Sequence, residues 1–136
     1  MNDAAHTLLG LRDFGAFCKR RDGATSVRTL LELTADRVPG GPLAGTVELT
    51  VRADAFCHSM VRSLVGALVD VASGRRDVHW LRRVTATAAR SPDVQVMPAK
   101  GLTLEEVVYP PDDQLAARVT DARSVRLAVP APEVPA

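Results

Sequence analysis

Hydrophobic residues recur along the chain at two different periods, and each period predicts one kind of element. Apolar and polar residues alternate over residues 25–33 and again over residues 46–53, which is typical of half-buried strands. A Pro- and Gly-rich loop, residues 38–45, separates them and predicts an antiparallel pair. The residues expected to face inward are Val27, Thr29, Leu31 and Leu33 in the first strand, and Val47, Leu49, Val51 and Ala53 in the second.

Apolar residues spaced by three and four positions predict helices over residues 3–20, 55–74 and 78–89. Residues 90–100, around two prolines, are expected to be irregular. Alternation returns over residues 102–109 and predicts a third strand, with a bulge where its parity slips. The core stripe of the helix over 55–74 is expected to be Phe56, Met60, Leu64, Leu68 and Val71, widened by Val61, Val65 and Ala67.

The order of these elements is α-β-β-α-α-β, which indicates an α+β fold with helices packed on one face of a small, mainly antiparallel sheet. Residues 1–110 are expected to form this domain. Residues 111–136 form a charged and then Pro/Ala-rich tail, in which we expect one short helical turn and partial disorder, with the last ten residues loose. The edges of so thin a sheet call for cover by another domain or subunit.

Composition excludes several classes of protein. No apolar run approaches the roughly 20 residues that span a bilayer, and the N-terminus lacks the apolar segment of a signal peptide, so we expect a cytoplasmic protein without membrane contact. Cys18 and Cys57 form no metal-binding pattern and are expected to be free thiols, and the three histidines have no ligand-like spacing. We therefore expect no metal site. The net charge of +1 does not by itself indicate a nucleic-acid partner.

The helix over 55–74 has an unusual polar side. Spacings of four residues place His58, Arg62, Gly66 and Asp70 along one ridge. Arg62 is either one of many solvated cations or a partly buried charge that requires a carboxylate or phosphate. Gly66 is unfavourable in a helix interior, which indicates that another segment approaches the backbone there. No acidic residue of this chain is an obvious partner for Arg62.

Four motifs in order carry a resemblance to one family. AFCHSMVRSLVGALVDVASG resembles F-x-H-x-M-V-R-x-(I/L)-V-G-x-L-x-x-V-G-x-G of the tRNA pseudouridine synthase A family. LLGLRDFGAFCKRRDGATSVRTL is similar to its L-x-G-x-H-D-F-x-A-F segment and the following strand. RSPDVQVMPAKGLTLEEVVYP is similar to R-x-x-A-G-x-T-A-P-x-x-G-L-x-L-x-x-V-x-Y-P, and PPDDQLAAR resembles the tail of actinobacterial-type members. These matches cover nearly the whole chain.

The resemblance implies a cofactor-independent isomerase of the tRNA anticodon arm that flips out a uridine, cleaves its glycosidic bond and rejoins the base through carbon. Family members are homodimers that read tRNA mainly through shape and phosphates. Arg62 then matches the arginine that pairs with the catalytic Asp, and Leu102, after Gly101, matches the leucine beside the base. His58 and Gly66 belong to the same motif and are assigned to substrate binding. The cations expected to meet RNA phosphates are Arg20, Arg21, Arg75 and Arg76.

The family's catalytic Asp lies in a G-R-T-D-x-G-V-H-A motif, and this chain contains no such string. The loop SPDVQVM also departs from the family's x-A-G-x-T-A beside Leu102. We therefore expect the C-terminal half of the enzyme, inactive alone, with an N-terminal half as the missing partner. The alternative is a non-catalytic RNA-binding or dimerisation module derived from that enzyme.

Overall fold

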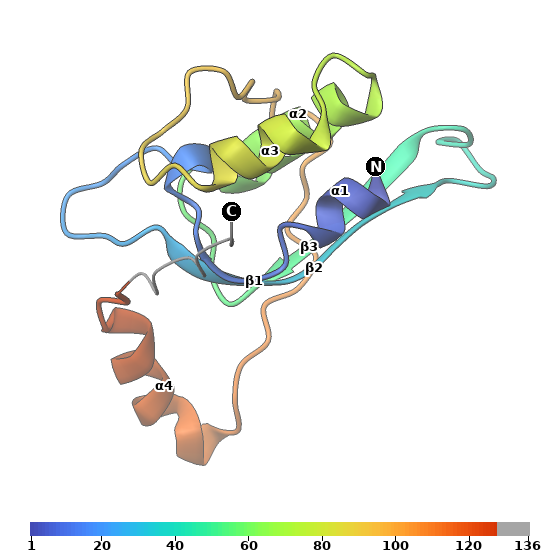
Figure 1. Cartoon of the computed structure of the whole chain (residues 1–136). Coiled ribbons are helices and arrows are strands. Elements are labelled where there is room, and N and C mark those ends of the chain that lie inside the picture. The colour runs from blue at the N-terminus through green and yellow to red at the C-terminus, as the bar shows by residue number, and fades with distance from the viewer. Residues whose placement is uncertain (128–136) are drawn as a thin grey trace.

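The computed structural model describes residues 1–127 and contains helices together with one three-stranded sheet (Figure 1). The elements in chain order are α1 (Asn2–His6), β1 (Gly10–Asp13), the 3-10 helix η1 (Gly15–Phe17), β2 (Val27–Arg37), β3 (Val47–Ala53), α2 (Met60–Ala72), α3 (Val78–Thr85), the 3-10 helix η2 (Asp112–Gln114) and α4 (Leu115–Arg123). The predicted α+β class is confirmed, although individual elements differ from the prediction.

The sheet is antiparallel and has the strand order β1-β2-β3. The predicted hairpin of β2 and β3 is confirmed, and the loop between them is the predicted one. On β3, Leu49, Val51 and Ala53 pack against the core, as their alternation predicted, whereas Val47 is exposed. β2 lies in the middle of the sheet and extends four residues beyond the predicted Leu33.

The predicted inward face of β2 is wrong in its central part. The pairing of β2 with β3 is irregular between Leu30 and Glu32. Such an irregularity changes which side of the sheet the neighbouring residues face. As a result Leu30 is buried together with Val27 and Leu33, while Leu31 is 52% exposed. The bulge therefore lies in this central strand, and the one expected within residues 102–109 is absent.

The hydrophobic core lies between the sheet and the two helices α2 and α3 (Figure 1). The stripe predicted on α2 is confirmed at Met60, Leu64 and Leu68, whose side chains are fully buried. Phe56 is 42% exposed because α2 begins at Met60 rather than at residue 55. The predicted helix over 78–89 is also confirmed, although it ends at Thr85. Other fully or nearly fully buried side chains of the core are Leu8, Phe14, Phe17, Trp80 and Leu81.

The helix predicted over residues 3–20 is wrong after His6. Gly10 has a φ of +96°, a left-handed conformation that glycine adopts without steric cost. The chain then enters β1, whose four residues pair with β2. Phe14 and Phe17 are buried as their spacing indicated, but they follow a strand and lie at η1. Pairing with a strand distant in sequence therefore overrides the local helical pattern.

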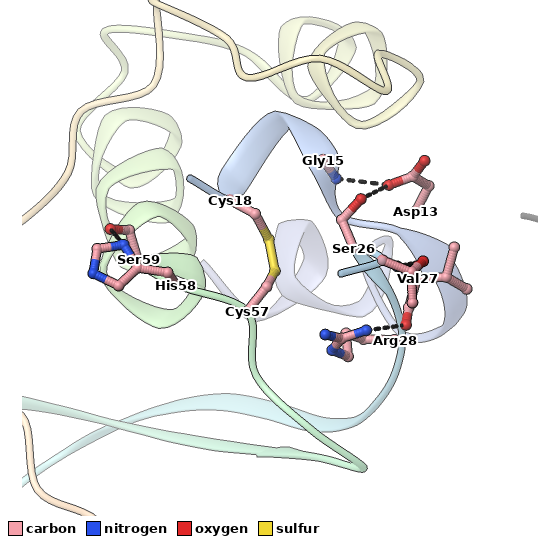
Figure 2. Close-up of a disulfide and its surroundings, with 10 residues drawn as sticks. Asp13, Gly15, Cys18, Ser26, Val27, Arg28, Cys57, His58 and Ser59 are labelled. Atoms are coloured by element: carbon pink, nitrogen blue, oxygen red, sulfur yellow. Dashed lines mark hydrogen bonds between the residues drawn. A yellow bond between two sulfur atoms is a disulfide. The ribbon is translucent and has the colours of Figure 1, made fainter. Parts of the chain in front are cut away.

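Asp13, at the end of β1, fixes the turn that leads into η1. Its carboxylate accepts hydrogen bonds from the backbone N–H of Gly15 at 2.9 Å and from the hydroxyl of Ser26 at 2.5 Å (Figure 2). A side chain at Gly15 would overlap the carbonyl oxygen of Ala88, so the segment after α3 packs directly on this turn. η1 is therefore held from two sides.

The strand predicted over residues 102–109 does not form. Residues 90–100 are irregular, as expected, and the chain from Leu102 to Tyr109 pairs with no strand among residues 1–127. Apolar side chains of this segment are exposed, including Leu104, Val108 and Tyr109. Alternation makes a segment suitable for a strand, but a strand requires a neighbour with free hydrogen-bonding groups. The third strand of the sheet is β1 instead.

The tail contains more helix than the single turn expected, since η2 leads directly into α4. Residues 128–136, which make up nearly all of the ten residues predicted to be loose, lie outside the described part. After α4 the chain returns to the sheet, where the Arg126 side chain forms an ion pair with Asp54. The backbone carbonyl oxygen of Arg126 accepts a hydrogen bond from the hydroxyl of Thr25 at 3.1 Å. These contacts attach the segment after α4 to the domain at Arg126.

The ion pair makes stability depend on acid pH. Burial alone would raise the pKa of Asp54, but hydrogen bonds from Arg126 and from the backbone of Thr29 outweigh it, and the pKa is lowered. A carboxyl group whose pKa is lower in the folded protein than in the unfolded chain stabilises the fold. This stabilisation is fully present at pH values above the ordinary pKa of about 4, and it is lost as the pH falls through the pKa of the folded state. We expect the urea midpoint to fall more steeply below about pH 4 in the wild type than in Asp54→Asn. Parallel pH profiles for the two proteins would contradict this assignment.

Candidate functional site

The start of α2 brings three polar side chains together. Ser59, the residue before the helix, has a φ of +70° and is the one non-glycine residue with positive φ among residues 1–127. Such a conformation is costly for a residue with a side chain. The Ser59 hydroxyl does not cap the helix but lies 3.0 Å from Nδ1 of His58 and accepts a hydrogen bond from Arg62 at 3.4 Å. His58 and Arg62 are therefore linked through a strained serine.

Arg62 has no carboxylate partner in the described part of the chain. Its side chain is half-buried, and none of the ion pairs found among residues 1–127 includes it. Asp70, the acid on the same ridge, is buried and bound by Arg75, with nitrogen–oxygen distances of 2.8 and 2.6 Å. A partly desolvated guanidinium without a counter-charge is unfavourable. The site is therefore suited to receive a carboxylate or phosphate from outside this domain.

Gly66 confirms the expected close approach of another segment. A methyl group in its place would overlap the carbonyl oxygen of Gln95. One turn earlier, the carbonyl oxygen of Arg62 accepts a hydrogen bond from the backbone N–H of Met97 at 3.2 Å. Residues 95–97 therefore run directly over the ridge of α2, which is not a solvated surface at Gly66 and Asp70.

Gly101 and Leu102 follow this covering segment by a few residues. Gly101 has a φ of +80°, and the N–H of Leu102 donates to the carbonyl of Ala99 at 3.0 Å, so the two residues form a tight turn. The Leu102 side chain is 52% exposed and thus available for contact with another molecule. The segment that crosses α2 at Gly66 therefore also carries the exposed Leu102.

The four cations predicted to meet phosphates differ in their surroundings. Arg20 and Arg21 are exposed in the loop after η1 and make no ion pair with another described residue. Arg75 is occupied by Asp70, and the guanidinium of Arg76 lies 5.2 Å from the ring centroid of Trp80. The first two are freer to contact a ligand, whereas the second two have structural contacts as well.

The two cysteines are joined in the structure, contrary to the expectation of free thiols (Figure 2). Cys18 follows η1 and Cys57 precedes His58, and their Cα atoms lie 5.7 Å apart, within the range that a disulfide requires. Beside the bridge, the N–H of Lys19 donates to the carbonyl of His58 at 2.9 Å. A separation of 39 residues gave no local signal of this pairing. The bridge fastens the segment that carries His58 and Ser59 to η1.

Within residues 1–127, no three His, Cys, Asp or Glu side chains are grouped so that they could hold a metal ion. The same part of the chain contains no helix of the length and hydrophobicity needed to cross a membrane.

Fold and site together define an α+β domain in which helix α2 presents a half-buried arginine with no carboxylate partner among residues 1–127. A family-level comparison matches residues 4–110 to tRNA pseudouridine synthase. The chain belongs to this family.

Curated relatives named tRNA pseudouridine synthase A agree with this assignment. The protein of Cutibacterium acnes is 63% identical over 126 residues, which cover 93% of this chain and 44% of the relative. The protein of Streptomyces griseus is 51% identical over 93% of this chain and 43% of the relative. The protein of Mycobacterium leprae is 47% identical over 93% of this chain and 42% of the relative. The chain thus spans less than half the length of these relatives.

Proposed function

We propose that this chain supplies the Arg62-bearing domain of a tRNA pseudouridine synthase, which isomerises uridine to pseudouridine in the tRNA anticodon arm. The observation that carries the proposal is the half-buried guanidinium of Arg62, which has no ion-pair partner among residues 1–127. We also propose that the complete enzyme acts on tRNA, forms a homodimer and is located in the cytoplasm.

Arg62 would hold the catalytic carboxylate supplied by an Asp-bearing segment. A guanidinium offers two parallel N–H donors to one carboxylate, which fixes its orientation and favours the ionised form. The carboxylate then acts as nucleophile or base on the flipped-out uridine. The bond between N1 of the base and C1′ of the ribose breaks, a bond between C5 and C1′ forms, and C5 loses its proton while N1 gains one. Positioning of this kind is sensitive, because a displacement of about 1 Å can cost about 100-fold in rate.

The remaining site residues support this arrangement. Ser59 links His58 to Arg62, and the segment packed on Gly66 leads to Gly101 and Leu102. The exposed Leu102 would pack beside the target base, and His58, exposed at the start of α2, would face the substrate. Arg20, Arg21, Arg75 and Arg76 would contact RNA phosphates. This chain alone is expected to be inactive, since it lacks the Asp motif.

A chimera tests the proposal. In the Cutibacterium acnes relative, the matched segment is replaced by the corresponding 126 residues of this chain, and pseudouridine formation is measured on an unmodified tRNA transcript. We expect activity in the chimera and none in the isolated chain. Arg62→Gln in the chimera should lower kcat by about 100-fold or more.

The matched control is Arg52→Gln, which removes an exposed arginine on β3 and should leave kcat unchanged. Turnover by the isolated chain would mean that another residue acts in place of the Asp. The exposed Arg20 and Arg21 favour the alternative, a non-catalytic RNA-binding module. That alternative becomes the better description if the isolated chain binds tRNA and the chimera is folded but forms no pseudouridine.

A further inference from the structure

A pocket of about 240 Å³ lies where the tail returns to the sheet. Figure 1 shows the C-terminal end of α4 close to the start of β2. Arg28 on β2 and Asp54, directly after β3, line one side of the pocket, and Arg118, Arg123 and Arg126 line it from α4 and the segment after it. Side chains from regions more than 60 residues apart in sequence therefore converge on one cavity.

Arg28 lies in an environment that favours an anion. Its Nη1 donates to the carbonyl of Val27 at 2.6 Å, but its Nε–H is buried and finds no hydrogen-bond partner among residues 1–127. Burial lowers the pKa of Arg28, an effect that Asp54 opposes and Arg126 reinforces. A buried donor left without an acceptor is destabilising, so an acceptor beside this guanidinium would stabilise the protein.

Asp54 does not balance the charge of the pocket. Its two oxygens are already used by Arg126 and by the backbone N–H of Thr29. Neither Arg118 nor Arg123 forms an ion pair with another residue of the described chain. The lining thus contains four guanidinium groups and one carboxylate, which leaves three positive charges uncompensated by lining residues.

The orientation of Arg118 supports the same conclusion. All other residues of α4 are exposed, but Arg118 is half-buried and lines the pocket. A long cation placed beside other cations is unfavourable unless an anion lies between them. α4 makes few other contacts with the domain, so an anion here would also hold the helix in place.

We propose that this pocket binds a phosphate group between Arg28 on the sheet and Arg118 and Arg123 on the tail. Guanidinium groups match the geometry of phosphate oxygens, and a phosphate has enough acceptor oxygens to bind arginines from both sides at once. The proposal concerns residues 111–127 as well as the sheet, and it does not depend on the proposed isomerase activity.

The test is calorimetric titration of the full chain with three probes at low salt: inorganic phosphate, a nucleoside monophosphate and a dinucleotide with one internal phosphodiester. We expect phosphate to bind, and Arg118→Gln to weaken binding about tenfold or more, as loss of a charged hydrogen bond does. Arg28→Gln should have a similar effect. The control is Arg37→Gln, which removes the same charge at the other end of β2 and should have no such effect.

Absence of phosphate binding to the wild type would overturn the proposal, as would equal affinities of the Arg118→Gln and Arg37→Gln variants. Because Arg118 lies on a helix with few contacts, its substitution should leave the fold intact even if Arg28→Gln does not. Comparable affinity for the dinucleotide would identify a nucleic-acid backbone as the ligand, whereas binding of inorganic phosphate and monophosphate alone would identify a free phosphate or a phosphate monoester. The titration requires no turnover, so failure of the isomerase proposal would not be confused with failure of this one.

Discussion

Reduction of the Cys18–Cys57 bridge is expected to lower the free energy of unfolding by about 4 kcal/mol. The bridge closes a loop over a sequence separation of 39 residues, and in the chain-entropy account its removal gives the unfolded chain far more conformations. The bridge also fastens the start of α2 to η1, so the loss should be accompanied by local opening near His58. The measurement is urea unfolding followed by circular dichroism, with and without dithiothreitol.

The double variant Cys18→Ala/Cys57→Ala is the matched control. It should unfold at about the same urea concentration as the reduced wild type, and dithiothreitol should have no effect on it. Thiol titration of the denatured, unreduced wild type should find no free thiol, and reduction should release two. Two free thiols before reduction would contradict the disulfide, and an unchanged urea midpoint after reduction would contradict its role in stability.

Gly66→Ala is expected to destabilise the protein by about 3 kcal/mol. In an exposed helix interior this substitution stabilises by about 1 kcal/mol, because alanine is the better helix former. Here the added methyl group would overlap the Gln95 carbonyl, so the covering segment would have to move away from α2. That movement would also break the hydrogen bond from Met97 to the carbonyl of Arg62. Chemical denaturation measures the sign of the effect directly.

Gly40→Ala provides the comparison for this substitution. Gly40 lies in the loop between β2 and β3, has no neighbouring atom near an added methyl group and does not have a positive φ. Its substitution should change stability by no more than about 0.5 kcal/mol. If Gly66→Ala proved as stable as the wild type or more stable, residues 95–97 would not be packed on α2 as the structure shows.

Arg62, which has no ion-pair partner among residues 1–127, connects these two predictions to function. The bridge holds the residues before α2, and the segment over Gly66 covers the helix one turn beyond Arg62. Both variants should therefore alter the position of the guanidinium without removing it. In the chimera, a moderate loss of kcat in Gly66→Ala would fit a site whose geometry depends on packing.

The sequence predicted those elements in which local pattern and tertiary environment agree. The alternation of β3, the Pro/Gly loop and the stripe on α2 each have one face against the core, so periodicity alone located them. Residues 10–13 were predicted wrongly, because their helical spacing is overridden by pairing with β2. Residues 102–109 were also predicted wrongly. Their alternation predicted a strand, but among residues 1–127 no neighbouring strand pairs with them.

For the candidate site, the sequence by itself determined that Arg62 lies on the ridge of a helix, that no obvious acid accompanies it and that Gly66 requires a close neighbour. These properties follow from helical spacing, which is local. Only the tertiary structure decided that Gln95 is that neighbour, that Asp70 belongs to Arg75, that Cys18 meets Cys57 and that Arg28 shares a pocket with Arg118. Each of these contacts joins residues from different elements or loops, and the arrangement of those segments is set by packing of the whole core rather than by any short stretch of sequence.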